Sequence, residues 1–139
     1  MATTKPVPQA LTGHWIDSKF YSLATGVLVP AGTFVCNNAG EAQPATDTLM
    51  QGGAKFLGVS AATYDNSAGG SPLTIQMGFI RGAAVYATGK SGDLPVAADV
   101  GGPVYLSDNQ TVKHTNAGSD YAVTLLEILP GAQGFKVLI

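Results

Sequence analysis

The segment of the chain closest to a known binding motif is residues 84–91, which read AVYATGKS. The Gly-Lys-Ser ending matches the end of a phosphate-binding loop, with alanine in place of the first glycine. A phosphate-binding loop must open a helix, because the amides of the helix N-terminus hold the phosphates. A glycine, an aspartate and Pro95 follow at once and prevent such a helix. We therefore expect a polar turn between strands here, and no nucleotide site.

The residues that most often ligate metals or act as nucleophiles are scarce. His14 and His114 are the only histidines, and no Cys/His/Asp cluster has the spacing of a metal site. A catalytic triad assembled in space stays open, although no local signature of one is present. Cys36 is the single cysteine, so the chain forms no internal disulfide, and a buried hydrophobic role is the expected one.

Carboxylates are equally few. Glu41 and Glu127 are the only glutamates, Asp93 and Asp99 flank an alanine-rich loop, and Asp108 falls in an expected turn. Aspartate in turns commonly accepts hydrogen bonds from its own backbone, and a glycosidase would need two opposed carboxyl groups. We expect no catalytic residues, no cofactor and no metal.

The composition argues for a protein that packs against other subunits. Hydrophobic residues make up 45% of the chain and charged residues only 12%, with a formal net charge of −2. Such a charge-poor surface is weakly protected against association. The seven basic residues are scattered, so no positive stripe for nucleic acid is expected. No apolar run approaches the length of a membrane span, and the polar N-terminus does not resemble a signal peptide.

Short apolar runs between frequent glycines and prolines predict many short strands. Residues 73–87 show the clearest alternation, and Gly78 and Gly82 are expected to bend or bulge this stretch. Its expected buried face consists of Leu73, Ile75, Met77, Phe79, Ala83, Val85 and Ala87. The other expected strands are 27–29, 33–36, 56–60, 103–107, 112–115, 121–129 and 135–139.

These elements predict an all-β fold, a compact β-barrel or β-sandwich of short strands with an extended N-terminal arm. The arm comprises residues 1–22, and a single β domain comprises residues 23–139. Residues 104–106 and 111–113 are expected to form a hairpin. Short helical turns are compatible with 46–55 and 95–100, and residues 64–71 are expected to form a mobile surface loop.

Three aromatic residues of the expected arm, Trp15, Phe20 and Tyr21, lie outside the strand pattern. They could seal one end of the core, or they could anchor the arm to a partner, because aromatic residues dominate buried interfaces. Pro6 and Pro8 bias the preceding residues toward extended backbone, so the first residues are expected either to lie on another surface or to stay disordered.

From about residue 27 to the C-terminus, the chain resembles the phage capsid decoration (head cement or stabilisation) proteins. No counterpart is found for residues 1–19. The resemblance rests on motifs in order: GVLVPAGT at 26–33, AQPAT at 42–46, FLGV at 56–59, GFIRG at 78–82, VYLSDNQTV at 104–112 and the apolar strand at 135–139.

The resemblance implies a virion structural protein that decorates the outside of a phage head and stabilises the capsid lattice. Its implied partners are the major capsid protein and two further copies of itself in a homotrimer, without nucleic acid or membrane. It would be made in the host cytoplasm and end on the capsid exterior. We expect the arm to contact a neighbouring subunit or the shell to which the protein binds. Two alternatives stay open: a phage tail or fibre module that binds surface carbohydrate through Trp15, Tyr64 and Tyr86, and a hydrolase with a site assembled in space.

Overall fold

The computed structural model describes the backbone of residues 15–139 and the side chains of residues 17–139. Its strands form two closed five-stranded barrels and one two-stranded sheet. The strands are β1 (Trp15–Leu23), β2 (Leu28–Val29), β3 (Phe34–Asn38), β4 (Glu41–Pro44), β5 (Lys55–Ser60), β6 (Tyr64–Asp65), β7 (Leu73–Arg81), β8 (Ala84–Gly89), β9 (Pro103–Leu106), β10 (Thr111–Lys113), β11 (Ala122–Ile128) and β12 (Phe135–Leu138). The helical elements are α2 (Asp47–Gln51) and the 3-10 turns η1 (Ala97–Asp99) and η2 (Pro130–Ala132).

The first barrel has the strand order β1-β4-β3-β5-β7. Strand β1 pairs antiparallel with β7 along nine residues, from Trp15 opposite Arg81 to Leu23 opposite Leu73. Its parallel pairing with β4 closes the barrel and involves only Ser22 and Leu23. The side chains that fill this barrel are aliphatic residues, one methionine and one aromatic ring: Leu23, Val29, Val35, Ala42, Met77 and Phe79.

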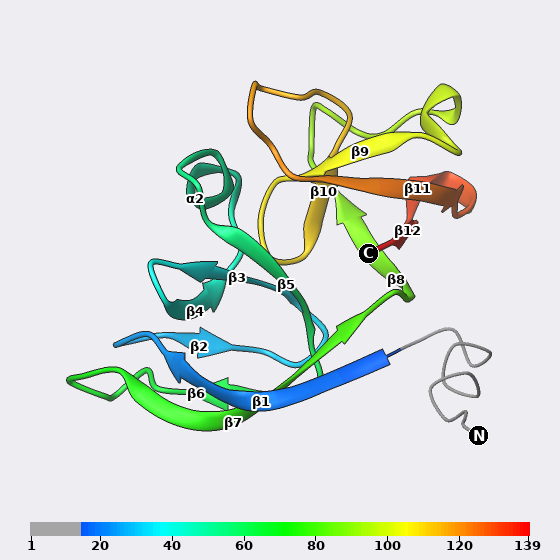
Figure 1. The fold of residues 1–139 in the computed structure, drawn as a ribbon. Helices are drawn as coiled ribbons and strands as arrows, with labels where there is room; N and C mark the ends of the chain where they lie inside the picture. The colour runs from blue at the N-terminus through cyan, green and yellow to red at the C-terminus, as the bar shows by residue number, and fades with distance from the viewer. Residues whose placement is uncertain (1–14) are drawn as a thin grey trace, which may run out of the picture.

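The second barrel has the strand order β10-β8-β12-β11-β9. Strand β7 continues into β8 after a bend at Gly82, whose φ of 66° lies in the left-handed region that glycine favours. The two barrels are therefore joined by one nearly continuous stretch of chain, which runs from the lower to the upper part of Figure 1. Strands β9 and β10 pair antiparallel, with Val112 opposite Leu106, as a hairpin.

One hydrophobic core spans the two barrels. It includes Phe34, Phe56 and Met50 from the first half of the chain and Leu106 and Phe135 from the second. The ring of Phe56 stacks on that of Tyr121, with centroids 4.7 Å apart. Apolar burial contributes roughly 25 cal/mol per Å². Because residues of both barrels bury their surface in this one core, it stabilises the two barrels together.

The expected all-β fold is confirmed, as is its barrel architecture. Helix α2 lies within the expected region 46–55. The Thr46 side chain caps it by accepting a hydrogen bond from the Leu49 amide.

Two expectations need correction. Gly78 does not interrupt β7, and residues 15–22 belong to β1 rather than to an arm. Residues 1–14, the rest of the expected arm, lie outside the described residues.

The expected surface loop 64–71 is tied to the first barrel by a buried side chain. The Asn66 amide nitrogen donates to the carbonyl oxygens of Ala24 at 3.0 Å and Ser71 at 2.9 Å. Tyr64 pairs with Val29 in the β2–β6 sheet, and its hydroxyl accepts a hydrogen bond from the Gly78 amide at 2.7 Å. Sequence patterning missed this anchor because asparagine is common in exposed turns as well.

Candidate interaction surface

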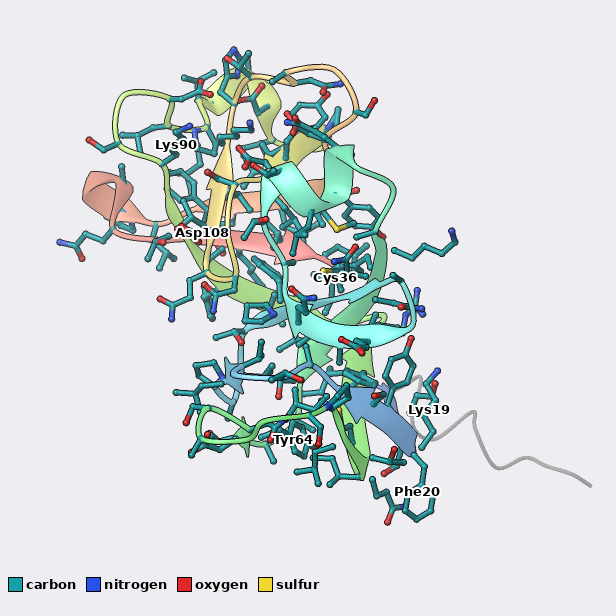
Figure 2. The ribbon with its side chains drawn as sticks, turned by 90° about the vertical axis from the view of Figure 1, so that its left-hand side faces the viewer. Lys19, Phe20, Cys36, Tyr64, Lys90 and Asp108 are labelled. Atoms are coloured by element: carbon teal, nitrogen blue, oxygen red, sulfur yellow. The ribbon has the colours of Figure 1, made fainter. Side chains whose placement is uncertain are left out.

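Strand β1 carries the most exposed large hydrophobic side chain of the described residues. Phe20 is 72% exposed and lies opposite Gln76 of β7, which is also exposed. Figure 2 shows Phe20 and Lys19 at the rim of the first barrel, pointing away from its body. An aromatic ring in this position is available to a partner.

The three aromatic residues expected to act together lie on one strand but do not share one environment. Tyr21 is partly buried, and its ring meets Phe79 edge-on at a centroid distance of 6.0 Å. Burial raises the pKa of the Tyr21 hydroxyl, with the charge of Cys36 as a smaller cause. Because side chains alternate along a strand, Phe20 points to the opposite face. Trp15 begins β1, and its side chain lies outside the described ones.

The outer side of the second barrel carries further exposed apolar side chains. Tyr86 of β8 is 64% exposed and lies opposite Lys136 of β12, while the exposed Leu138 lies opposite Ala84. Leu94, Val96 and Val100 are exposed on the connection that contains η1. Scattered exposed apolar side chains are ordinary on protein surfaces, so this group is less distinctive than Phe20.

A cavity of about 370 Å³ opens beside Tyr86, at the junction of the two barrels. The side chain of Phe34 contributes to its wall, and none of the described residues that line it is charged. Its polar lining comes from Thr33, Thr88, Asn109, Gln110 and Gln133. Side-chain amides beside an exposed aromatic ring suit a neutral, hydroxyl-rich ligand.

The most deeply buried charges form a cluster that joins the two halves of the chain. The Lys113 ammonium lies 3.1 Å from Asp120 and 3.3 Å from Asp47, which begins α2. Asp120 also accepts hydrogen bonds from the Gln51 side chain and the Ala117 amide. Every member has a partner, so we assign this cluster a structural role.

Burial alone would lower the pKa of Lys113, but hydrogen bonds to Asp120 and Asp47, and their charges, raise it. Burial alone would raise the pKa of Asp120. The hydrogen bonds from Gln51, Ala117 and Lys113, together with the Lys113 charge, outweigh that effect and lower it. The raised pKa of Lys113 and the lowered pKa of Asp120 are consistent, because each charged partner favours the ionised form of the other.

His114, one of the two histidines of the sequence, pairs with a carboxylate at the surface. Its Nδ1 lies 2.7 Å from Asp99 Oδ2. The hydrogen bond to Asp99 and then the Asp99 charge raise the pKa of His114. The pKa of Asp99 is lowered mainly by the hydrogen bond from the Val96 amide. His14 lies outside the described residues.

We expect His114 to titrate at a higher pH than a free imidazole, and Asp99→Asn to bring its pKa back toward about 6.5. An NMR pH titration in a His14→Ala background would leave one imidazole signal to follow. The interaction is fully present below the unfolded pKa and is lost as the pH rises through the folded pKa. Asp108→Asn serves as the distant control, and an unchanged pKa in Asp99→Asn would contradict the ion pair.

The remaining candidates have structural explanations. Cys36 is fully buried, and burial raises the pKa of its thiol to about 11, so a nucleophilic thiolate is disfavoured. The segment 84–91 forms β8 and a turn, in which the Asp93 amide donates to the Lys90 carbonyl. Gly89 is required by packing, because a Cβ there would lie 2.5 Å from both Leu94 and Phe135.

Within residues 15–139, no group of three or more His, Cys, Asp or Glu side chains could hold a metal ion. No helix of that described part is long and apolar enough to cross a membrane. Comparison with family models, curated proteins and solved structures finds no match to this chain.

Proposed function

We propose that this chain is a virion structural protein that decorates the outside of a phage head and stabilises the capsid lattice. In this proposal it binds the major capsid protein and assembles as a homotrimer on the shell. The observation that carries the proposal is Phe20, a large apolar side chain 72% exposed on β1. The motif resemblance given above supplies the kind of partner.

Three properties of the chain support the proposal. Two barrels joined by a common core give a stiff body without a disulfide. A surface with few charges can pack closely against protein neighbours. Phe20 would contribute roughly 1.5–3 kcal/mol when fully buried by a partner, which is typical of an interface anchor.

A second candidate function, carbohydrate binding in a tail or fibre module, is favoured by the cavity beside Tyr86. Its uncharged polar lining offers the side-chain amides of Asn109, Gln110 and Gln133 next to an aromatic ring, whereas the hydroxyls of Thr33 and Thr88 already bond within the chain. The hydroxyl of Tyr64, the other described tyrosine considered for this role, already accepts a hydrogen bond from the Gly78 amide. A glycan array would separate the candidates, because only the carbohydrate function requires that Tyr86→Ala abolish a glycan signal.

Cosedimentation with shells assembled from the capsid protein of the same phage tests the first proposal. We expect Phe20→Ala to weaken shell binding about tenfold, the effect of losing roughly 1.4 kcal/mol. The melting temperature should hardly change, because the removed ring is exposed. Tyr86→Ala is the matched control, an exposed aromatic residue on the other barrel, and should bind as the parent does.

Deletion of residues 2–12, in the segment before β1, should also weaken shell binding while the barrels stay folded. If the deleted protein and Phe20→Ala both decorate shells with the parent's affinity, this surface does not bind the shell. If no variant and no parent protein binds any shell, the decoration function itself is wrong.

A further inference from the structure

Strand β1 has one edge that is paired along its whole length and one that is paired only at its end. All nine residues pair with β7, whereas β4 pairs with β1 at Ser22 and Leu23 alone. Within the part of the chain that the structure describes, no backbone hydrogen bond reaches the second edge between residues 15 and 21. Residues 17–20 are all exposed, as expected of an open strand edge.

The pairing register shows which backbone groups face this open edge. The Gly78 carbonyl accepts from the Ala61 amide and the Gly78 amide donates to Tyr64, so both groups point away from β1. Opposed residues of antiparallel strands exchange either both hydrogen bonds or neither. Ser18 lies opposite Gly78, so its amide and carbonyl point away from β7. The amides and carbonyls of Ile16 and Phe20, each two residues from Ser18, also point away from β7.

We propose that two copies of this chain associate through the open edges of β1, antiparallel and related by a two-fold axis that passes at Ser18. In this register Ser18 exchanges hydrogen bonds with Ser18 of the second copy, and Phe20 exchanges them with Ile16 of the second copy. The pairing ends at Tyr21, because β4 occupies the same edge from Ser22 onward.

The side-chain sequence of β1 is complementary to itself in this register. Asp17 lies opposite Lys19 of the second copy, and Lys19 lies opposite its Asp17. Within one copy these two side chains already form an exposed ion pair at 3.4 Å, so both charges lie on the same face of the strand. In the same register, Ile16 falls opposite Phe20 of the second copy, and Trp15 falls opposite its Tyr21. Oppositely charged and aromatic cross-strand pairs stabilise a sheet.

The same charges disfavour the other antiparallel registers. A shift by one hydrogen-bonded pair in either direction places Asp17 opposite Asp17, or Lys19 opposite Lys19, of the second copy. Like charges that face each other directly are destabilising. Charged side chains on an edge strand commonly prevent association. Here opposite charges two residues apart instead select one register and one partner, a second copy of the same strand.

This association goes beyond the proposed decoration of shells and does not depend on shell binding. A two-fold contact of this kind is isologous, so it closes after two copies. In a homotrimer each subunit would keep its own open β1 edge, and the contact would link neighbouring trimers. The association is therefore tested with the purified full-length chain without shells. Failure of this association and failure of shell binding then show up in different experiments.

Charge variants mixed in pairs test the register. Asp17→Lys places lysines at both positions and Lys19→Asp places aspartates at both, so each variant alone should self-associate at least about tenfold more weakly. Mixed in equal amounts, the two should form a heterodimeric contact as strong as the parent's, measured by sedimentation velocity with one variant labelled. The double variant Asp17→Lys/Lys19→Asp should also recover. Unchanged association in the single variants, or no recovery on mixing, would overturn the proposal.

A cysteine cross-link tests the position of the axis. Opposed hydrogen-bonded residues have Cα atoms about 5.5 Å apart, within the range of a disulfide. Ser18→Cys should therefore give covalent dimers on mild oxidation, because the native Cys36 is buried and does not compete. Gln76→Cys is the matched control, exposed on the adjacent strand and remote from the axis, and should stay monomeric on a non-reducing gel. The deletion of residues 2–12 should leave the Ser18→Cys yield unchanged or higher. If Ser18→Cys cross-links no better than Gln76→Cys in both the full and the shortened chain, the edges do not pair.

Discussion

Replacing Lys113 by methionine should lower the free energy of unfolding by about 3–5 kcal/mol, the usual cost of breaking a buried ion pair. The Asp120 side chain is fully buried and lies 3.1 Å from the Lys113 ammonium. Methionine fills a similar volume but leaves the Asp120 carboxylate without its counter-charge. Because Asp47 at the start of α2 shares the same ammonium, the contact between α2 and the second barrel should weaken as well. Urea denaturation at pH 7 measures the loss.

A double variant separates the lost charge from lost packing. Adding Asp120→Asn to Lys113→Met removes the stranded carboxylate, so the double variant should be more stable than the sum of the two single losses by at least about 1 kcal/mol. Additive losses would show that the pair contributes no coupling. Lys136→Met, at a partly exposed position on β12, is the control for the substitution itself and should cost little.

The same cluster sets an expected response to acid and to base. The pKa of Asp120 is lowered in the folded chain, so its stabilisation is present above the unfolded value of about 3.9 and is lost as the pH falls through the folded value. The pKa of Lys113 is raised, so its stabilisation is present below about 10.4 and is lost as the pH rises through the folded value. In Lys113→Met, the effect at high pH should disappear with the lysine, and the effect at low pH should shrink.

Gly58→Ala should lower the free energy of unfolding by about 3 kcal/mol, because two independent costs fall on one position. The backbone there has a φ of 132°, which side-chain-bearing residues rarely adopt. An added Cβ would lie 2.6 Å from the Ile80 carbonyl oxygen, where β5 passes β7. The pairing of β3 with β5 also shifts register next to Gly58, between Val35 and Cys36.

Gly26→Ala is the matched control for Gly58→Ala. Its φ of 72° is also positive, but an added Cβ there meets nothing within 4 Å. It should cost only about 1 kcal/mol, the strain of a left-handed backbone without a steric clash. Thermal and urea unfolding of the two variants side by side would measure the difference. Equal losses would show that the contact with Ile80 relaxes freely.

The part of the fold that sequence patterning predicts best is the part with one buried and one exposed face. In β7, Met77 and Phe79 are buried while Thr74 and Gln76 are exposed, as expected for this stretch. The exception is Leu73, which was expected to be buried but is 41% exposed at the start of the strand. Sequence patterning did not predict strand β1, because the exposed Asp17 and Lys19 interrupt the apolar alternation.

The buried charge cluster and the anchor at Asn66 could not be read from the chain in advance. Asp47 is far from Lys113 and Asp120 in sequence, and the three residues meet only in the folded chain. A lysine that directly follows a buried valine in a short strand offers no local signal of burial. For Phe20, the aromatic type suggested a partner contact, and its exposure agrees with that hypothesis.

The most direct test of the decoration proposal is electron cryomicroscopy of phage heads with and without this chain, at matched capsid protein. We predict added density on the outer surface of the shell, fitted by three copies of the two-barrel body, with β1 next to the capsid protein. Heads that lack the chain should also rupture at a lower temperature. Identical shells in the two preparations, or density for this chain at the tail rather than on the head, would contradict the account.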